Sequence, residues 1–206
     1  MQAKIEDDTQ RIHYLLQHSS KRFTTIRQLI WVCACLTVGA TCSGLTADAH
    51  GPTPHKIDET VEVAAKPEAV WALIADFPAI SKWHPSVAAS VPREDPVQGK
   101  LRVLTLASGA NIVDGLTEYD PAKMTYSYRR VDDDVKALPV SSYTATITVE
   151  PAADGGTKVE WIGRYYRGDT GNEPPEDLND EAAEKAMTEF FQTGLHNLKF
   201  LAERKG

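Results

Sequence analysis

The chain has 206 residues, of which 42% are hydrophobic and 25% charged, and its formal net charge at pH 7 is −7. An acidic chain of this kind lacks the basic footprint that nucleic acids and anionic membrane surfaces require of their protein partners. The three cysteines, Cys33, Cys35 and Cys42, all lie near the N-terminus, so the remainder of the chain has no disulfides and no thiolate chemistry.

The N-terminal region has the pattern of a cleaved secretion signal. Basic residues, the last of them Arg27, precede an apolar run from Leu29 to Ala40. This run is much shorter than the roughly twenty residues that a membrane-spanning helix needs. The small residues Ala47 and Ala49 flank Asp48 in the arrangement that a signal peptidase cleaves. We therefore predict export, with His50 as the first mature residue.

The predicted cleavage site divides the chain into two parts. Residues 1–49 are the N-terminal extension and signal peptide, and residues 50–206 are one domain. Five of the 22 basic and four of the 29 acidic residues fall in the first part, so the remaining 157 residues have a net charge of −8. A domain of this size buries enough surface to fold without disulfides. Its acidic surface serves solubility or suits a basic protein partner.

Hydrophobic periodicity after His50 predicts a strand followed by one or two short helices. The segment Ile57–Val63 alternates with a period of two, as a half-buried strand does. Pro67 then stands where the first turn of a helix tolerates it, and the apolar residues up to Phe77 fall on one helical face. A second short helix is predicted over Ala79–His84, because Pro85 would end it.

Six further strands, separated by turn residues, are typical of an antiparallel meander. Their inner faces meet a core and their outer faces carry Thr, Ser, Lys and Glu. The predicted strands are Val87–Arg93, Lys100–Ala107, Ile112–Tyr119, Met124–Val131, Ser142–Glu150 and Thr157–Arg167.

A long amphipathic helix is predicted from Asn179 to Arg204, with an apolar stripe that includes Met187 and Leu198. A curved seven-stranded sheet must cover one face, and this helix is the element long enough to do so. The predicted fold class is therefore α+β, a helix-grip in which a seven-stranded antiparallel sheet surrounds a long C-terminal helix, with one or two short helices after the first strand.

Two groups of residues are candidate binding sites. Aromatic side chains gather on the inner face, where either a ligand cavity or ordinary core packing would explain them. His84 could act as an acid or base, but the sequence shows no partner for it, and we assign no catalytic residue, no metal site and no cofactor. The predicted pocket-lining residues are Trp83, His84, Tyr126, Tyr128, Tyr143, Trp161, Tyr165, Met187 and Phe191. The predicted partner-binding residues are Asp169, Glu173, Glu176, Asp177, Asp180, Glu181 and Glu184.

Short motifs along the chain resemble the START-like or Bet v 1-like superfamily (SRPBCC), in its polyketide cyclase and dehydrase branch. The resemblance implies a helix-grip fold with a hydrophobic ligand pocket, and it allows either a carrier or sensor of a small hydrophobic molecule or a cyclase/aromatase-like enzyme. The motifs are Lys66–Trp71, Asp76–Phe77, Trp83–Pro85, Gly99–Arg102, Leu116–Asp120, Leu138–Val140 with Tyr143, and Val159–Trp161.

The two ends of the predicted mature chain resemble the MxaD-type periplasmic proteins of bacterial methanol oxidation. This resemblance implies a periplasmic, non-enzymatic accessory role in electron transfer between quinone-dependent methanol dehydrogenase and its cytochrome, which would be the partners. It transfers no catalytic residue to this chain. The matching segments are His50–Pro54, Tyr165–Gly168, Asn172–Pro175, Leu178–Ala183 and Gly194–Leu198.

Overall fold

The computed structural model describes residues 52–132, 134–153 and 155–204. The predicted signal peptide, its cleavage site and the three cysteines lie outside the described residues, so these predictions stay untested. Within the described ranges, no helix is both long enough and apolar enough to cross a membrane.

Seven antiparallel strands form one sheet in the order β1-β7-β6-β5-β4-β3-β2. The strands are β1 (His55–Val63), β2 (Val87–Asp95), β3 (Gly99–Leu106), β4 (Asn111–Asp120), β5 (Thr125–Arg130), β6 (Val140–Pro151) and β7 (Thr157–Arg167). The helices are α2 (Pro67–Ile74), α3 (Asp180–Glu203) and the 3₁₀ helices η1 (Phe77–Lys82) and η2 (Glu176–Leu178).

The predicted alternation is confirmed most clearly in β6 and β7. Ile147 is paired with Trp161, and Val149 with Val159, and all four side chains are buried on the inner face. Residues between them point to the outer face, since side chains alternate along a strand. The order of elements and the antiparallel sheet confirm the helix-grip α+β fold.

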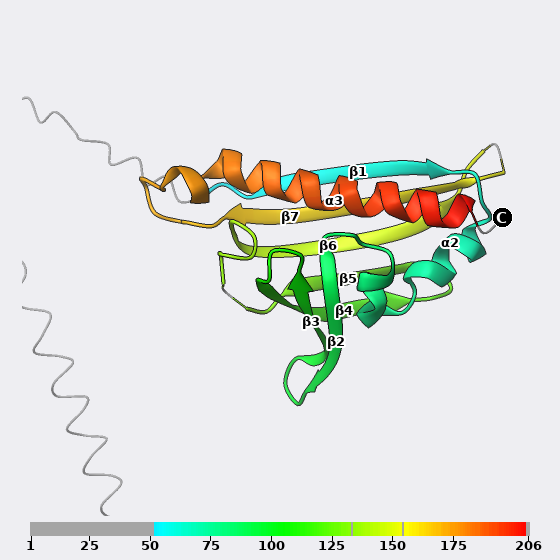
Figure 1. Cartoon of the computed structure of the whole chain (residues 1–206), viewed down its shortest axis with the longest axis horizontal. Helices are drawn as coiled ribbons and strands as arrows, with labels where there is room; N and C mark the ends of the chain where they lie inside the picture. Colours follow the sequence, from blue (N-terminus) through cyan, green and yellow to red (C-terminus); the bar gives the residue numbers. More distant parts are fainter. Residues whose placement is uncertain (1–51, 133, 154, 205–206) are drawn as a thin grey trace, which may run out of the picture. The chain divides into compact units, whose positions relative to one another are not determined.

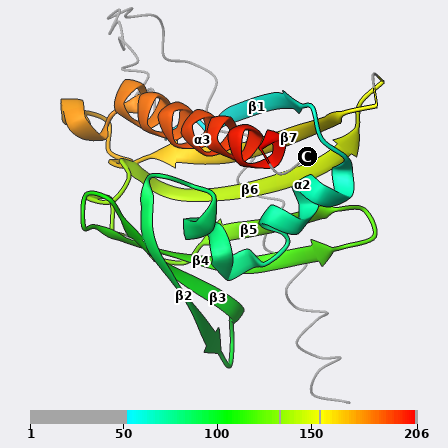
Figure 2. The same cartoon turned by 45° about the vertical axis from the view of Figure 1, so that its right-hand side comes forward.

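Helix α3 lies lengthwise over β1 and β7, whereas α2 and η1 lie over the middle and far side of the sheet (Figures 1 and 2). The Asn179 side chain caps α3 by accepting a hydrogen bond from the Ala182 backbone N–H at 2.9 Å. Close contact with the sheet depends on Gly163 of β7, where a Cβ atom would lie 2.8 Å from Ile57 Cγ2 and 3.0 Å from Phe191 Cζ.

Most boundaries differ from the predicted ones by one or two residues, and two of the differences have a clear local cause. The second short helix begins at Phe77 and is a 3₁₀ helix, because the extended backbone of Asp76 ends the preceding segment and Pro78 starts the next turn. Strand β5 begins at Thr125, one residue later than predicted, since Met124 has a φ of 50° in the preceding turn. Neither change alters which side chains face the core.

Candidate functional site

All nine side chains that the sequence analysis assigned to a pocket are buried in the core. Most of them pack on each other: the rings of Trp161 and Phe191 stack with centroids 4.2 Å apart, and Trp83 lies 5.6 Å from Trp161. None of the nine lines either of the two surface clefts described below. Their part in ligand binding stays a prediction; in this structure they are core residues.

His84 is fixed by hydrogen bonds at both ring nitrogens. Its Nε2 lies 2.9 Å from the Phe190 carbonyl oxygen, and its Nδ1 lies 3.2 Å from the Ser86 backbone nitrogen. Because the carbonyl can only accept and the amide can only donate, the imidazole is neutral with its proton on Nε2. Burial lowers the pKa of His84 to about 4. These contacts make His84 a structural residue rather than an acid or base near neutral pH.

The polar centre of the inner face is an ion pair between Arg102 of β3 and Asp114 of β4, which are neighbours across the two strands. Asp114 Oδ2 accepts hydrogen bonds from Arg102 Nε at 2.9 Å and lies 2.8 Å from Nη2. The Tyr143 hydroxyl donates to Asp114 Oδ1, and Arg102 Nη1 donates to the Phe77 carbonyl at 2.9 Å. Both charged side chains are only 1% exposed.

Aromatic rings enclose this ion pair. The Arg102 guanidinium carbon lies 4.2 Å from the centroid of the Phe77 ring and 4.6 Å from that of Tyr128. Cation–π contacts of this kind offset part of the cost of burying the charge. The Tyr128 hydroxyl also accepts a hydrogen bond from Trp161 Nε1 at 3.1 Å, which joins the ion pair to the core under α3.

Burial and the ion pair together set the protonation of this centre. Burial alone would lower the pKa of Arg102, but the Asp114 carboxylate outweighs it and the pKa is raised. Burial raises the pKa of Asp114 while Arg102 opposes that rise, and three donors directed at its oxygens suit the ionised carboxylate. Burial also raises the pKa of Tyr126 to about 12, so this phenol is neutral at physiological pH.

A cleft of about 610 Å³ opens beside the ion pair, between the C-terminal side of α2, η1 and strands β2, β3 and β4. Phe77 belongs to both features, because it lines the cleft while its ring and carbonyl hold Arg102. The cleft therefore has a rigid wall whose position depends on the buried charges. Its lining residues are Ala75, Asp76, Phe77, Pro78, Pro92, Arg93, Glu94, Lys100, Leu101, Leu116 and Tyr119.

The sequence analysis assigned no site role to Arg102, Asp114 or the cleft. A signal for the two charged residues was present, since Arg102 is in phase with the inward-facing Leu104, and Asp114 with Ile112. A charge on the apolar phase of a strand must be paired when it is buried. The cleft had no such signal, because its walls come from η1, the two residues before it and three different strands.

A second, smaller cleft of about 280 Å³ lies beside α3. Its lining includes Ser86, Ser108, Glu189, Phe190 and Thr193. Within the described ranges, no group of three or more His, Cys, Asp or Glu side chains is arranged to hold a metal ion.

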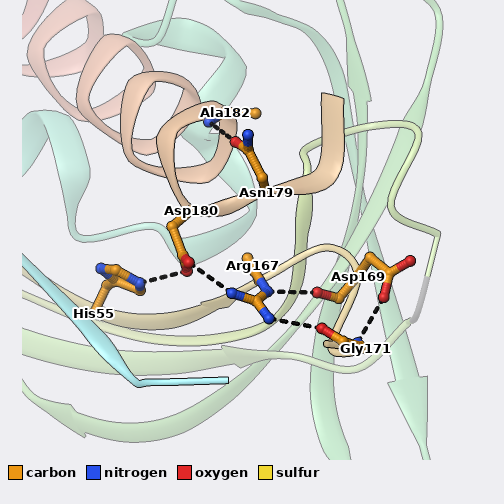
Figure 3. Close-up of polar contacts among 7 residues, drawn as sticks. All are labelled: His55, Arg167, Asp169, Gly171, Asn179, Asp180 and Ala182. Atoms are coloured by element: carbon orange, nitrogen blue, oxygen red, sulfur yellow. Dashed lines mark hydrogen bonds and ion pairs between the residues drawn. The ribbon is translucent and has the colours of Figure 1, made fainter. Parts of the chain in front are cut away.

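The predicted partner-binding residues fall into two groups. Two of them, Asp169 and Asp180, are contacted by Arg167, which holds the link between β7 and α3 in place (Figure 3). Arg167 Nη1 lies 2.6 Å from Asp180 Oδ2, and its other two nitrogens donate to the backbone carbonyls of Asp169 and Gly171 at 2.7 Å. His55 Nε2 lies 2.7 Å from Asp180 Oδ1. The Asp169 carboxylate accepts a hydrogen bond from the Gly171 backbone N–H at 2.7 Å, so the side chains of Asp169 and Asp180 both hold this link in place. The remaining predicted residues, Glu173, Glu176, Asp177, Glu181 and Glu184, are exposed and form no described ion pair.

The family model described as polyketide cyclase / dehydrase and lipid transport matches residues 54–203. No curated protein matches the chain with significant sequence similarity.

Several solved structures share the fold. An uncharacterised protein from Bacillus thuringiensis is 23% identical with a TM-score of 0.59, and the match covers 72% of this chain and 98% of that one. The ZhuI aromatase/cyclase from Streptomyces sp. R1128 is 19% identical with a TM-score of 0.58, covering 74% and 96%. Ara h 8.0201 is 18% identical with a TM-score of 0.56, covering 73% and 98%. At these identities the likeness concerns the fold alone.

Proposed function

The chain belongs to the polyketide cyclase/dehydrase and lipid transport family, and we propose that it works by holding a small, mainly apolar molecule in the cleft walled by Phe77, Leu101 and Leu116. The observation that carries this proposal is the cleft itself. Its volume of about 610 Å³ lies within the range of roughly 300–1,000 Å³ that is usual for small-molecule sites. Binding in the cleft requires no rearrangement of the buried ion pair.

The composition of the cleft favours a molecule with an apolar body and a polar end. Phe77, Pro78, Pro92, Leu101 and Leu116 supply the apolar surface. The charged residues of the lining are Asp76, Arg93, Glu94 and Lys100, all exposed and none in a described ion pair. An apolar wall sets affinity and a few polar groups set orientation in most such sites.

A carrier or sensor function fits these features better than cyclase-like chemistry. The ZhuI aromatase/cyclase has the same fold, but fold does not determine function. The strongest charges near the cleft, Arg102 and Asp114, neutralise each other behind Phe77. An acid–base role would require one of them to leave its partner and reach the ligand.

The proposal can be tested with the fluorescent probe 8-anilinonaphthalene-1-sulfonate, which has an apolar body and one anionic group. We expect Leu116→Trp to fill the cleft and weaken binding at least about tenfold, equivalent to about 1.4 kcal/mol. Val91→Trp is the matched control, because Val91 is 58% exposed and does not line the cleft. Unchanged binding by a folded Leu116→Trp variant would exclude the cleft.

A second proposal is a periplasmic accessory role between methanol dehydrogenase and its cytochrome. It rests on the resemblance of the terminal segments and on the five exposed acidic residues around the start of α3, which would attract a basic partner. Cytochrome reduction by the dehydrogenase should be faster with the protein present, and less so as ionic strength rises from about 0.01 M to 0.15 M. No stimulation at either ionic strength would refute this role.

A further inference from the structure

The outer face of the sheet carries a row of basic residues in register. The strand pairings connect Lys56 of β1, Arg164 of β7, Arg129 of β5 and Arg93 of β2 in one line across all seven strands. The intervening positions are the uncharged Thr144, Gly115 and Leu101. We call these four cations the basic row; all four are exposed, and the line contains no acidic residue.

Most of the basic row has no carboxylate partner. Lys56 pairs with Asp58 at 2.6 Å, whereas Arg129 donates to the neutral Gln98 side chain at 3.3 Å. Among the described residues, Arg93 and Arg164 form no ion pair. By contrast, Arg167, only three residues beyond Arg164, is fully engaged by Asp180 and two backbone carbonyls. Arg167 is thus neutralised by a carboxylate, whereas the three arginines of the basic row have no carboxylate partner among the described residues.

Placing these like charges in one row destabilises the sheet, and no contact among the described residues requires them there. Lys56 and Arg164 are directly opposite each other on adjacent strands, where like charges destabilise a sheet. At about 4.8 Å per strand, the row extends over about 29 Å, with Arg164 and Arg129 about 10 Å apart. Tyr166, 37% exposed, lies two residues along β7 from Arg164 on the same face and adds an aromatic contact of the kind enriched in protein interfaces.

We propose that the basic row docks an acidic protein surface whose carboxylates pair with Arg164 and Arg129. Guanidinium groups bind carboxylates with two parallel hydrogen bonds, which favours arginine over lysine at such a surface. A duplex nucleic acid fits less well, because four cations on a chain with a net charge of −7 are a small footprint for it. The basic row meets the cleft only at Arg93, which lies at the cleft rim, whereas Arg129 and Arg164 do not line the cleft. Its charge is opposite to that of the acidic residues near α3.

An oligoglutamate of about ten residues is a suitable probe, since an extended chain of about 3.3 Å per residue spans the row. Backbone amide NMR at about 0.01 M ionic strength should show shifts on β1, β7, β6 and β5. The double variant Arg129→Glu/Arg164→Glu should lose at least about tenfold in affinity, equal to about 1.4 kcal/mol. The control Lys82→Glu/Lys185→Glu makes the same change in net charge at exposed residues outside the row and should bind as the unaltered protein does.

Three results would overturn the proposal: no binding of the oligoglutamate, equal weakening by both double variants, or amide shifts outside the row. Tighter binding of a DNA duplex or of phosphatidylglycerol vesicles than of the oligoglutamate would overturn the choice of an acidic protein. Arg129→Gln/Arg164→Gln removes the charges without adding carboxylates and should also weaken binding if the glutamate variant fails to fold. The substituted residues Arg129 and Arg164 do not line the cleft, so failure of these measurements would leave the proposed ligand function standing.

Discussion

The sheet is used differently beneath α3 and beneath α2 and η1. Under α3 the inner face is closed, because rings such as Trp161 and Phe191 stack and His84 has both nitrogens bonded. Under η1 the same face carries the paired charges of Arg102 and Asp114, and a cleft opens beside them. The long helix covers β1 and β7, which we call the closed half, whereas the two short helices leave the larger cleft open over the rest of the sheet, which we call the open half.

This difference separates the two roles that we propose for the sheet, which are stability and ligand binding. The closed half gains stability from close packing, which Gly163 and Gly194 permit by leaving room for neighbouring rings. The open half keeps Phe77 in place through a charged network, so the cleft has a defined shape before any ligand arrives. A preformed site binds with less loss of conformational entropy.

Removing one charge from the open half should have the largest effect. Asp114→Asn leaves Arg102 buried without a counter-ion, and we expect a loss of about 3–5 kcal/mol in the free energy of unfolding. Urea denaturation measures this change. The double variant Arg102→Met/Asp114→Leu removes both charges and should recover most of the loss, whereas a single-variant loss below about 1 kcal/mol would show that the pair is not buried in solution.

Acid should lower the free energy of unfolding of the protein through His84, which lies in the closed half. Its pKa in the folded state is about 4, below the unfolded value of 6.5, so the unfolded chain binds the proton more readily. The contribution to stability is present above about pH 6.5 and is lost as the pH falls through about 4, up to about 3 kcal/mol. Urea denaturation across this range should show the loss.

The same titration in two variants assigns that loss to a residue. We expect His84→Gln to have a flatter dependence of unfolding free energy on pH between about 4 and 6.5. His196→Gln, at an exposed histidine of α3, is the control and should keep the slope. Equal slopes in all three proteins would contradict the assignment to His84.

A smaller effect is expected from filling the space that Gly194 leaves. A Cβ atom there would lie 2.6 Å from His84 Cδ2 and 2.9 Å from Trp161 Cζ3. We expect Gly194→Ala to cost about 1–3 kcal/mol through overpacking, despite its better helix propensity. Thr193→Ala, exposed on the same helix, should be neutral or slightly stabilising. A gain of about 1 kcal/mol in Gly194→Ala would show that the helix can move away.

The architecture and most of the buried residues of the closed half could be predicted from the sequence. Alternation in β6 and β7 and the stripe of α3 depend on local periodicity, so the burial of Trp161 and Phe191 follows directly. The ion pair and the cleft of the open half could not be predicted from local periodicity. The pairing of Arg102 with Asp114 depends on strand register, and the cleft depends on the position of η1 relative to three strands.

A ligand that binds in the open half should leave the packing of the closed half unchanged. The most direct measurement is intermolecular NOE contact between bound 8-anilinonaphthalene-1-sulfonate and the protein. We predict contacts to the methyl groups of Leu116 and to the rings of Phe77 and Tyr119, all of which line the cleft. Contacts to Trp161 and Phe191 in their place would put the ligand under α3 and contradict the account.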